Sequence, residues 1–385
     1  MEFVLIDDPT VWRNFLPLTF TKPVSYLRCG ILTIKQKWEK FLDVSVMVHS
    51  EKYLSNKFNN FSKSEAIFIS SNVMPNKHLV ELIKNLKTNQ ALTFNNKLVA
   101  FNGVSKQNGN QNLNCTELTI EPLMLNNVWD IFQKNSEALK NDFEILTQNK
   151  KSENISSSNT IIGDKNLIFL EKGAKVEACI LNTNSGPIYL GEESEIMEGS
   201  VVRGGLALCE HSVLKLSTKI YGATTIGPYS KVGGEVNNSV IFGYSNKAHD
   251  GFLGNSVIGE WCNLGADTNN SNLKNNYGNV KLYNYLQKTM IDTGLQFCGL
   301  IMGDYSKSGI NTMFNTGTVV GVGANVFGSG FPSTHINNFS WGGAEGFSEY
   351  QIEKLIETTK IVYNRRGLVF DNVDEQILID IKNNN

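Results

Sequence analysis

The chain has 385 residues, more than one ordinary domain needs, so at least two structural units are expected. Its formal net charge is −2 and its lysines and arginines form no basic stripe, which removes the electrostatic reason to expect a nucleic-acid partner. Six scattered cysteines without a CxxC pair, no apolar run approaching about 18 residues and no secretion signal at the start favour a reduced, cytoplasmic protein without a membrane span.

Residues 1–150 have the pattern of an α/β unit. Short apolar strands alternate with helical spacing, and this alternation favours a largely parallel sheet. The strands are expected at 3–6, 44–48 and 66–69, and the helices at 31–41 and 79–86. Residues 148–159 are polar and rich in Lys, Asn and Ser, so we expect a linker there.

A period of six residues begins after this linker. A bulky aliphatic residue recurs at every sixth position of the central stretch: Leu190, Ile196, Val202, Leu208, Leu214, Ile220, Ile226 and Val232. A small hydroxyl residue stands two positions before most of them: Ser194, Ser200, Ser212, Thr218, Thr224 and Ser230. The period continues upstream through Ile162, Ile168, Ala174 and Ile180 and downstream through Met302, Ser308, Phe314, Val320 and Val326. Such a period predicts a solenoid of very short strands, whose coils bury their apolar row only by stacking.

We therefore expect three parts: an α/β domain at 1–150, a solenoid at 160–345 and a helical segment at 346–385. Helical spacing returns at 348–366 and at 375–381. Such helices would cap or flank the last coils, whose edges otherwise stay unpaired.

The repeats resemble the left-handed parallel β-helix of hexapeptide-repeat acyltransferases, a family in which three strands make each coil and the trimer is the usual assembly. Residues 245–276 resemble the glucosamine-1-phosphate acetyltransferase half of the bifunctional bacterial enzymes that make UDP-N-acetylglucosamine, with a His, a Leu-Gly pair and spaced Asn residues in the same order. This resemblance implies a catalytic role for His249 and substrate or cofactor contacts for Asn263 and Asn272. The family has tyrosines where this chain has Phe252 and Leu273, so the acceptor sugar is left open.

The N-terminal part resembles a shortened sugar nucleotidyltransferase domain. Arg13, Leu16-Pro17-Leu18-Thr19 and Lys22-Pro23 match that family's opening elements. The glycine-rich loop that normally precedes the Arg is replaced by residues 7–12, and Ser71-Asn72 stands where the family has a metal-holding Gly-Asp pair. The whole layout resembles that of bifunctional sugar nucleotidyltransferase and acyltransferase proteins.

Acyl transfer from a thioester to an amine needs a base for the proton of the nucleophile and N–H donors for the oxyanion. His249 lies at a break in the six-residue rhythm, where a side chain can leave the packed wall and face a cleft; an exposed loop histidine is the alternative. Glu235 and Lys247 are further candidates for substrate or cofactor contacts, and Glu235 could equally be a solvated turn residue. His211 and His335 are too far from His249 in sequence to favour a zinc site, and His211 is expected on a coil corner.

Nucleotidyl transfer needs cationic side chains for the phosphates and usually a divalent metal. Arg13, Lys22 and Arg28 could supply the positive charge. Asp7 or Asp8 could hold Mg²⁺, although an Asp-Asp-Pro loop after a strand is also ordinary turn chemistry.

The sequence thus predicts an enzyme in which the β-helix transfers an acyl group, from acetyl-CoA, to an amino sugar phosphate. The N-terminal domain would bind, and could form, the UDP- or dTDP-sugar. A homotrimer is implied by the resemblance. The alternative is a non-catalytic sugar-nucleotide-binding protein whose β-helix only trimerises it.

The Asn-rich segment at 269–279 has two interpretations, a loop that reaches the cleft of a neighbouring subunit or a polar insertion.

Overall fold

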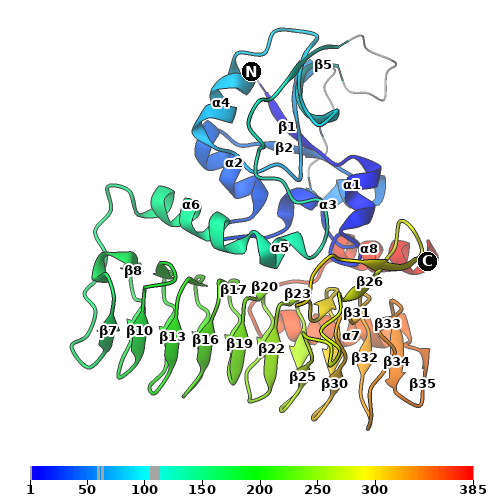
Figure 1. Ribbon diagram of the computed structural model, residues 1–385. Helices are drawn as coiled ribbons and strands as arrows, with labels where there is room; N and C mark the ends of the chain where they lie inside the picture. The colour runs from blue at the N-terminus through cyan, green and yellow to red at the C-terminus, as the bar shows by residue number, and fades with distance from the viewer. Residues whose placement is uncertain (1, 59–60, 62–64, 105–112, 385) are drawn as a thin grey trace.

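The computed structural model describes residues 2–58, 61, 65–104 and 113–384. An α/β region built from the N-terminal residues lies along one side of a long parallel β-helix, and the C-terminal helices pack near the last coils (Figure 1). The expected fold class, an α/β N-terminal region followed by a left-handed parallel β-helix with C-terminal helices, is therefore confirmed.

The N-terminal region is built on a six-stranded sheet with the order β2-β1-β3-β5-β4-β6. Its strands are β1 (Phe3–Ile6), β2 (Met47–His49), β3 (Glu65–Ser70), β4 (Gln90–Phe94), β5 (Lys97–Val104) and β6 (Asn114–Glu117). β1 pairs in parallel with both β2 and β3, so the carboxyl ends of these three strands meet at one edge. The sheet is mixed rather than largely parallel, because Asn95 and Asn96 both adopt positive φ and close β4 and β5 into an antiparallel hairpin.

Helices surround this sheet, and local capping explains where the second one begins. Thr33 and Gln36 form a capping box at its start, and its buried face carries Ile34, Trp38 and Leu42. The helices are α1 (Pro9–Asn14), α2 (Ile34–Leu42), α3 (Ser55–Phe58), α4 (Lys77–Lys84), α5 (Asp130–Gln133) and α6 (Asn135–Thr147), with short 3₁₀ turns η1 (Val24–Tyr26) and η2 (Lys52–Leu54).

The β-helix has three faces, which each coil visits in a fixed order. The first, here called the covered sheet, has nine strands: β8 (Ile168–Leu170), β11 (Ile188–Leu190), β14 (Leu206–Leu208), β17 (Thr224–Ile226), β20 (Val240–Gly243), β23 (Val257–Glu260), β28 (Ile301–Met302), β31 (Val319–Val320) and β33 (His335–Ile336). The second is the ten-stranded sheet: β9 (Lys175–Val176), β12 (Glu195–Ile196), β15 (Val213–Leu214), β18 (Lys231–Val232), β21 (Asn246–Lys247), β24 (Asn263–Leu264), β29 (Lys307–Ser308), β32 (Asn325–Val326), β34 (Ser340–Gly343) and β35 (Gly346–Glu349).

The third sheet completes each coil. Its six strands are β7 (Thr160–Ile162), β10 (Ile180–Asn182), β13 (Val201–Arg203), β16 (Lys219–Tyr221), β19 (Glu235–Asn237) and β22 (Phe252–Gly254), and the pair β25 (Asn269–Asn270) and β30 (Met313–Phe314) follows in later coils. Outside the coils lie the 3₁₀ turn η4 (Lys165–Leu167), the hairpin β26 (Lys281–Asn284) and β27 (Thr289–Asp292), and the helices α7 (Ile352–Asn364) and α8 (Asn372–Asn383).

The six-residue period marks the interior of the solenoid. All eight aliphatic residues from Leu190 to Val232 are at most 1% exposed, and the downstream row from Met302 to Val326 is also buried. The hydroxyl row is buried too, and Ser194, for example, donates to the carbonyl oxygen of Gly191 at 2.7 Å. The hydroxyls of the other members of the row except Thr224 likewise donate to backbone carbonyls at the coil corners, where regular strand pairing ends. The hydroxyl of Thr224 has no such partner among the described residues.

The predicted upstream continuation of the six-residue period was wrong at two positions. Ile162 is 42% exposed and Ile180 is 39% exposed, whereas their neighbours Ile161 and Leu181 pack in the interior. The reason is that β7 and β10 belong to the third sheet, where the middle residue of each three-residue strand points inward.

The covered sheet differs from the other two because its outward side chains are also buried. Phe169, Tyr189 and Ala207 lie in a cluster with Leu139 and Phe143 of α6. A larger cluster joins the N-terminal region to outward residues of later coils. The N-terminal region and the β-helix therefore share hydrophobic cores, and the division into separate domains stays an interpretation of the sequence.

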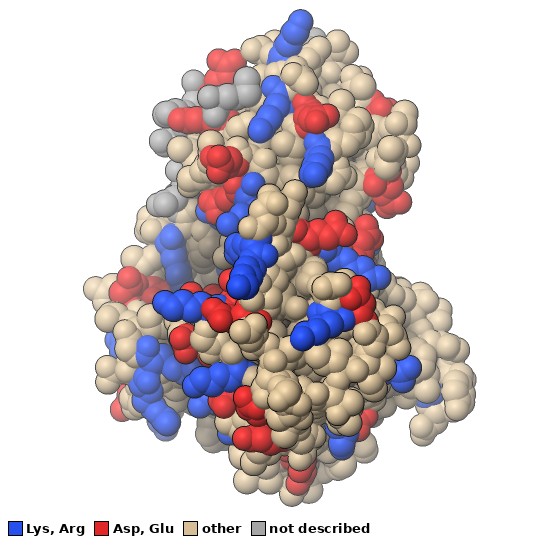
Figure 2. All heavy atoms as spheres, turned by 90° about the vertical axis from the view of Figure 1, so that its left-hand side faces the viewer, with Lys and Arg blue, Asp and Glu red and all other residues tan. Residues whose placement is uncertain are grey.

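Charged side chains of both signs are interspersed on the face that Figure 2 shows, over the N-terminal region and over the first coils. Within the described ranges, none of the helices combines the length and the apolar character that crossing a bilayer would need.

Candidate functional sites on two sides of the β-helix

His249 lies on the corner between β21 and β22, in the turn formed by residues 248–251. Each coil passes from the covered sheet to the ten-stranded sheet and then to the third sheet, so this corner is the one opposite the covered sheet. His249 and Asp250 are exposed there. The imidazole therefore stands outside the packed wall, on the side of the β-helix away from the N-terminal region.

Lys247 supports this turn from inside the solenoid. Its register partner is Val232, an interior residue, and Lys247 itself is only 2% exposed. The Nζ atom donates to the carbonyl oxygens of Gly233, at 2.9 Å, and of His249, at 2.7 Å. Loss of hydration in this interior lowers the pKa of Lys247 to about 8. Lys247 therefore supports the His249 turn from the interior of the solenoid. The sequence predicted instead that Lys247 would contact a substrate or cofactor.

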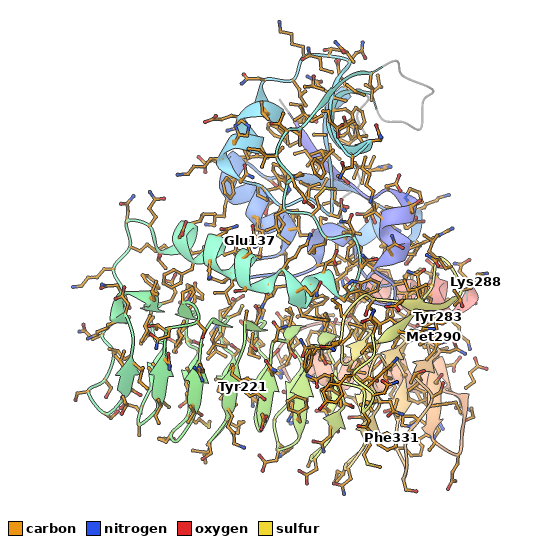
Figure 3. All side chains as sticks on the ribbon, in the orientation of Figure 1. Glu137, Tyr221, Tyr283, Lys288, Met290 and Phe331 are labelled. Carbon is orange, nitrogen blue, oxygen red and sulfur yellow. The ribbon has the colours of Figure 1, made fainter. Side chains whose placement is uncertain are left out.

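Two other predicted residues lie on the coils before and after this turn. Glu235 begins a strand of the preceding coil, and its N–H donates to Gly251 at 3.3 Å. Its carboxylate accepts a hydrogen bond at 2.6 Å from Tyr221, which is labelled in Figure 3. Asn263 is exposed on the following coil, in register with Asn246. Glu235, His249 and Asn263 therefore occupy three successive coils.

Asn272 is not brought to this corner. Its side-chain amide donates to Asn255 at 2.8 Å, at the opposite end of the third sheet, where the coil turns back to the covered sheet. Sequence reasoning did not single out Asn269 within the Asn-rich segment. Its Oδ1 atom accepts the N–H of Phe252 at 2.7 Å, just after the His249 turn.

The segment that follows the Asn-rich residues packs against its own chain. The hairpin β26–β27 places Tyr285 edge-on to Phe20 of the N-terminal region, with ring centres 5.5 Å apart. Tyr283 stacks on His335, with ring centres 3.5 Å apart. Tyr283, Lys288 and Met290 of this hairpin lie beneath the N-terminal region (Figure 3). His335 is thus part of an aromatic cluster.

His211 stands on a coil corner, as expected from its sequence context. It adopts φ 54° and is exposed, and it begins a column of stacked rings on successive coils. The column continues through Tyr229, Tyr244 and Trp261 to Tyr363 of α7. This column fastens the C-terminal helix to the corner of the β-helix.

A second candidate site is a cavity of about 910 Å³ in the N-terminal region. It opens where β1, β2 and β3 end, and its lining includes Asp7, Ser50 and Asn72, which follow these three strands. The crevice outside the carboxyl ends of parallel strands is the usual ligand position in α/β sheets.

None of the three cations predicted to bind a nucleotide lines this cavity. Arg13 is exposed in the last turn of α1. Lys22 is 3% exposed and forms ion pairs with β-helix carboxylates, at 2.5 Å to Asp304 and 2.9 Å to Glu260. Burial opposes the ammonium form of Lys22, but these carboxylates outweigh it and raise its pKa. Arg28 is also buried at the interface, where it donates to the carbonyl oxygen of Ile31 and, at 3.7 Å, to Sγ of Cys209 in the β-helix.

Asp7 and Asp8 do line the cavity, but their oxygens already have partners. The carboxylate of Asp7 accepts from the hydroxyls of Ser50 and Ser71 and from the N–H of Val24. Burial raises its pKa to about 6. Asp8 caps α1 and accepts the N–H groups of Thr10 and Val11. The described residues hold no cluster of three or more His, Cys, Asp or Glu side chains able to hold a metal ion, so this donor set does not fit Mg²⁺.

Comparisons with known proteins give a family for the N-terminal residues and relatives for part of the chain. Residues 3–151 match the family described as sugar nucleotidyl transferase. A bifunctional sugar-1-phosphate nucleotidylyltransferase/acetyltransferase of Sulfurisphaera tokodaii is 28% identical over 164 residues, which are 42% of this chain and 40% of that protein. The bifunctional protein GlmU of Methanocaldococcus jannaschii is 33% identical over 136 residues, 35% of this chain and 28% of that protein.

Among solved structures, that of the polySia-specific acetyltransferase NeuO covers 55% of this chain and 94% of its own, at 14% identity and a TM-score of 0.29. The match to this chain spans less than half the length of each of the two curated relatives named above. The resemblance to bifunctional sugar nucleotidyltransferases and acetyltransferases, predicted from the motifs, is confirmed.

Proposed function

We propose that this chain, whose residues 3–151 match the sugar nucleotidyl transferase family, is a transferase of sugar-nucleotide metabolism whose β-helix carries the reaction. The reaction is transfer of an acetyl group from acetyl-CoA to the amino group of a sugar phosphate. The observation that carries the proposal is the exposed His249 on a turn that a buried lysine holds from inside. The names of the relatives support acetyl transfer.

In this proposal His249 is the general base. The imidazole takes a proton from the amino group while the nitrogen attacks the thioester carbonyl. The carbon–sulfur bond then breaks, and the imidazolium returns the proton to the departing thiolate, which leaves as CoA. Glu235 and Asn263, on the coils before and after His249, would contact the acceptor or the donor.

Copies of the chain would associate through the faces that the N-terminal region leaves free. Ile180 and Val201 are neighbours in register on the third sheet and are 39% and 40% exposed. Exposed apolar side chains side by side are common at protein interfaces. A homotrimer formed there is consistent with the resemblance. Light scattering tests it, and Val201→Lys should reduce the mass to that of a single chain.

The test of acetyl transfer compares His249→Ala with the wild type. CoA release is measured with acetyl-CoA and glucosamine 1-phosphate, and then with a small panel of other sugar phosphates. We expect a loss of about 10²- to 10⁴-fold in kcat, because a positioned base contributes that much. His211→Ala, an exposed corner histidine elsewhere on the solenoid, is the matched control. An unchanged rate in His249→Ala would remove this assignment.

A second function has a specific observation in its favour. Lys22 and Arg28 of the nucleotidyltransferase-like elements are buried at the interface with the β-helix instead of lining the cavity. This arrangement favours a protein that binds a sugar-containing ligand in the N-terminal region without forming the nucleotide sugar. Pyrophosphate release from UTP or dTTP with a sugar 1-phosphate distinguishes the two functions.

A further inference from the structure

We propose that the N-terminal cavity binds an uncharged, hydroxyl-rich ring, as in a free sugar or a nucleoside, and excludes nucleoside triphosphates. The inference concerns the N-terminal region alone and does not depend on acyl transfer at His249. It rests on which groups line the cavity and on which of their hydrogen-bonding positions are already filled.

The position where a phosphate would bind is filled by the chain itself. In α/β folds the phosphate of a nucleotide sits on free N–H groups where the first strand turns into the first helix. Here that turn is Asp7-Asp8-Pro9, and Asp8 Oδ1 lies 2.9 Å from the N–H nitrogen of Thr10 and 3.4 Å from that of Val11. A carboxylate thus occupies the helix start, where it repels a second anion.

A bridging metal does not overcome this repulsion. Asp7 accepts three hydrogen bonds from Ser50, Ser71 and Val24. These donors take up three of the about four lone-pair positions of the carboxylate, and burial favours the protonated acid, which is a poor ligand for Mg²⁺. The side chain next to the β3 end, Asn72, donates to the carbonyl oxygen of Leu125 at 2.6 Å and so is also engaged.

The cavity has too little positive charge for a polyphosphate. Among its described lining residues, the Lys and Arg side chains are Lys52 and Lys97. The carboxylates of Asp7, Asp8 and Glu51 line it as well. The charges therefore nearly cancel, whereas a triphosphate brings several negative charges that need paired cations when water is excluded.

The rest of the lining suits a neutral polyol. Besides the engaged Asn72, four amide side chains border the cavity: Asn14, Asn96, Asn126 and Asn127. Phe68, Leu98 and Met124 supply an apolar wall. Amides can both donate to and accept from ring hydroxyls, and an apolar wall covers the carbon face of a sugar or the base of a nucleoside.

The test is ligand binding to the full-length chain, measured by saturation-transfer NMR and by calorimetry. The probes are glucose, uridine and UTP with Mg²⁺. We expect saturation transfer to glucose or uridine and none to UTP. Competition between glucose and uridine shows which ring the cavity prefers. Binding of UTP as tight as that of uridine would overturn the proposal, and so would a lack of binding by both neutral probes at millimolar concentration.

The variant Asp8→Gly locates the effect. It removes the carboxylate and frees the N–H groups of Thr10 and Val11, and glycine at a helix cap costs only a few tenths of a kcal/mol. We expect UTP to bind about tenfold tighter to this variant, or more, than to the wild type. The control Asp43→Gly removes an exposed carboxylate at the left-handed C-cap of α2 and should leave UTP binding unchanged. Equal UTP affinity in both variants would contradict the assigned role of Asp8.

Discussion

Lys22 and Asp304, which are 282 positions apart in the chain, form a buried ion pair that joins the N-terminal region to the β-helix. Thr21 also donates to Asp304, and the other carboxylate oxygen accepts the N–H of Glu260 at 2.8 Å. The Lys-Pro element that suggested phosphate binding is therefore a docking element in this chain. Its charge is matched by the solenoid, which leaves it unavailable to a ligand in the cavity.

Lys22→Met should destabilise the chain by about 3–5 kcal/mol, because it leaves Asp304 charged and buried without its cation. Urea unfolding measures the loss. The control is Lys35→Met, which breaks the partly exposed pair of Lys35 and Glu39 on α2 and should cost no more than about 0.5 kcal/mol. Adding Asp304→Asn to Lys22→Met should recover part of the stability. Equal midpoints for the two lysine variants would show that the interface pair is unimportant.

Lys247 should make stability depend on pH in the alkaline range. The folded chain releases the proton of Lys247 near pH 8, whereas the unfolded chain keeps it to about pH 10.4. Between these values the unfolded state binds more protons, so the free energy of unfolding rises with pH. Relative to Lys247→Met, the wild type should gain on the order of 2–3 kcal/mol across this window. Lys231→Met, on the neighbouring strand, is the control.

In the control Lys231→Met, the free energy of unfolding should rise with pH as steeply as in the wild type, because Lys231 is exposed. The measurement is denaturant unfolding at a series of pH values. If the free energy of unfolding changed with pH equally in the wild type and in Lys247→Met, Lys247 would not be held in the interior.

Gly30→Ala tests the close approach of the chain at Gly30 to α6. A Cβ at Gly30 would lie 2.5 Å from Asp142 Oδ2 and 2.7 Å from the backbone of Ala138, with φ at 80°. Gly294→Ala shares the left-handed backbone, with φ 71°, but its Cβ would meet nothing within 4 Å. The control should cost about 1–2 kcal/mol and Gly30→Ala at least about 2 kcal/mol more. Similar thermal midpoints would argue against the close approach.

Trp261→Ala tests the ring column that holds α7. Trp261 lies between Tyr244 and Tyr363, with ring centres 4.3 Å and 3.9 Å away, and is 8% exposed. We expect a loss of about 3–5 kcal/mol and a weaker near-UV circular dichroism signal. His211→Ala, at the exposed end of the column and with a similar positive φ, should cost less than about 1 kcal/mol. A Trp261→Ala variant as stable as His211→Ala would show that the column does not anchor the helix.

The position of His249 illustrates how far sequence reasoning reached. The break in the six-residue rhythm predicted a side chain outside the wall, and His249 is exposed on a corner. The prediction that Lys247 contacts substrate or cofactor was wrong, because the coil that brings it into register is shorter than its neighbours. Val232 pairs with Lys247, fifteen positions on, whereas Leu214 pairs with Val232, eighteen positions on. The change of coil length moved Lys247 into the interior row, where two backbone carbonyl oxygens accept hydrogen bonds from its Nζ atom.

The sequence by itself determined the β-helix and its buried rows, because each coil repeats the same local choice of inward and outward side chains and needs only its neighbours to bury them. It also indicated the strands and helices of the N-terminal region, since their periods are local. The cap that Asp8 forms on α1 is likewise a local contact. Only the tertiary structure decided that Lys22 and Arg28 serve the interface. That outcome depends on which distant groups meet, such as Asp304 beside Lys22, and no local pattern carries that information.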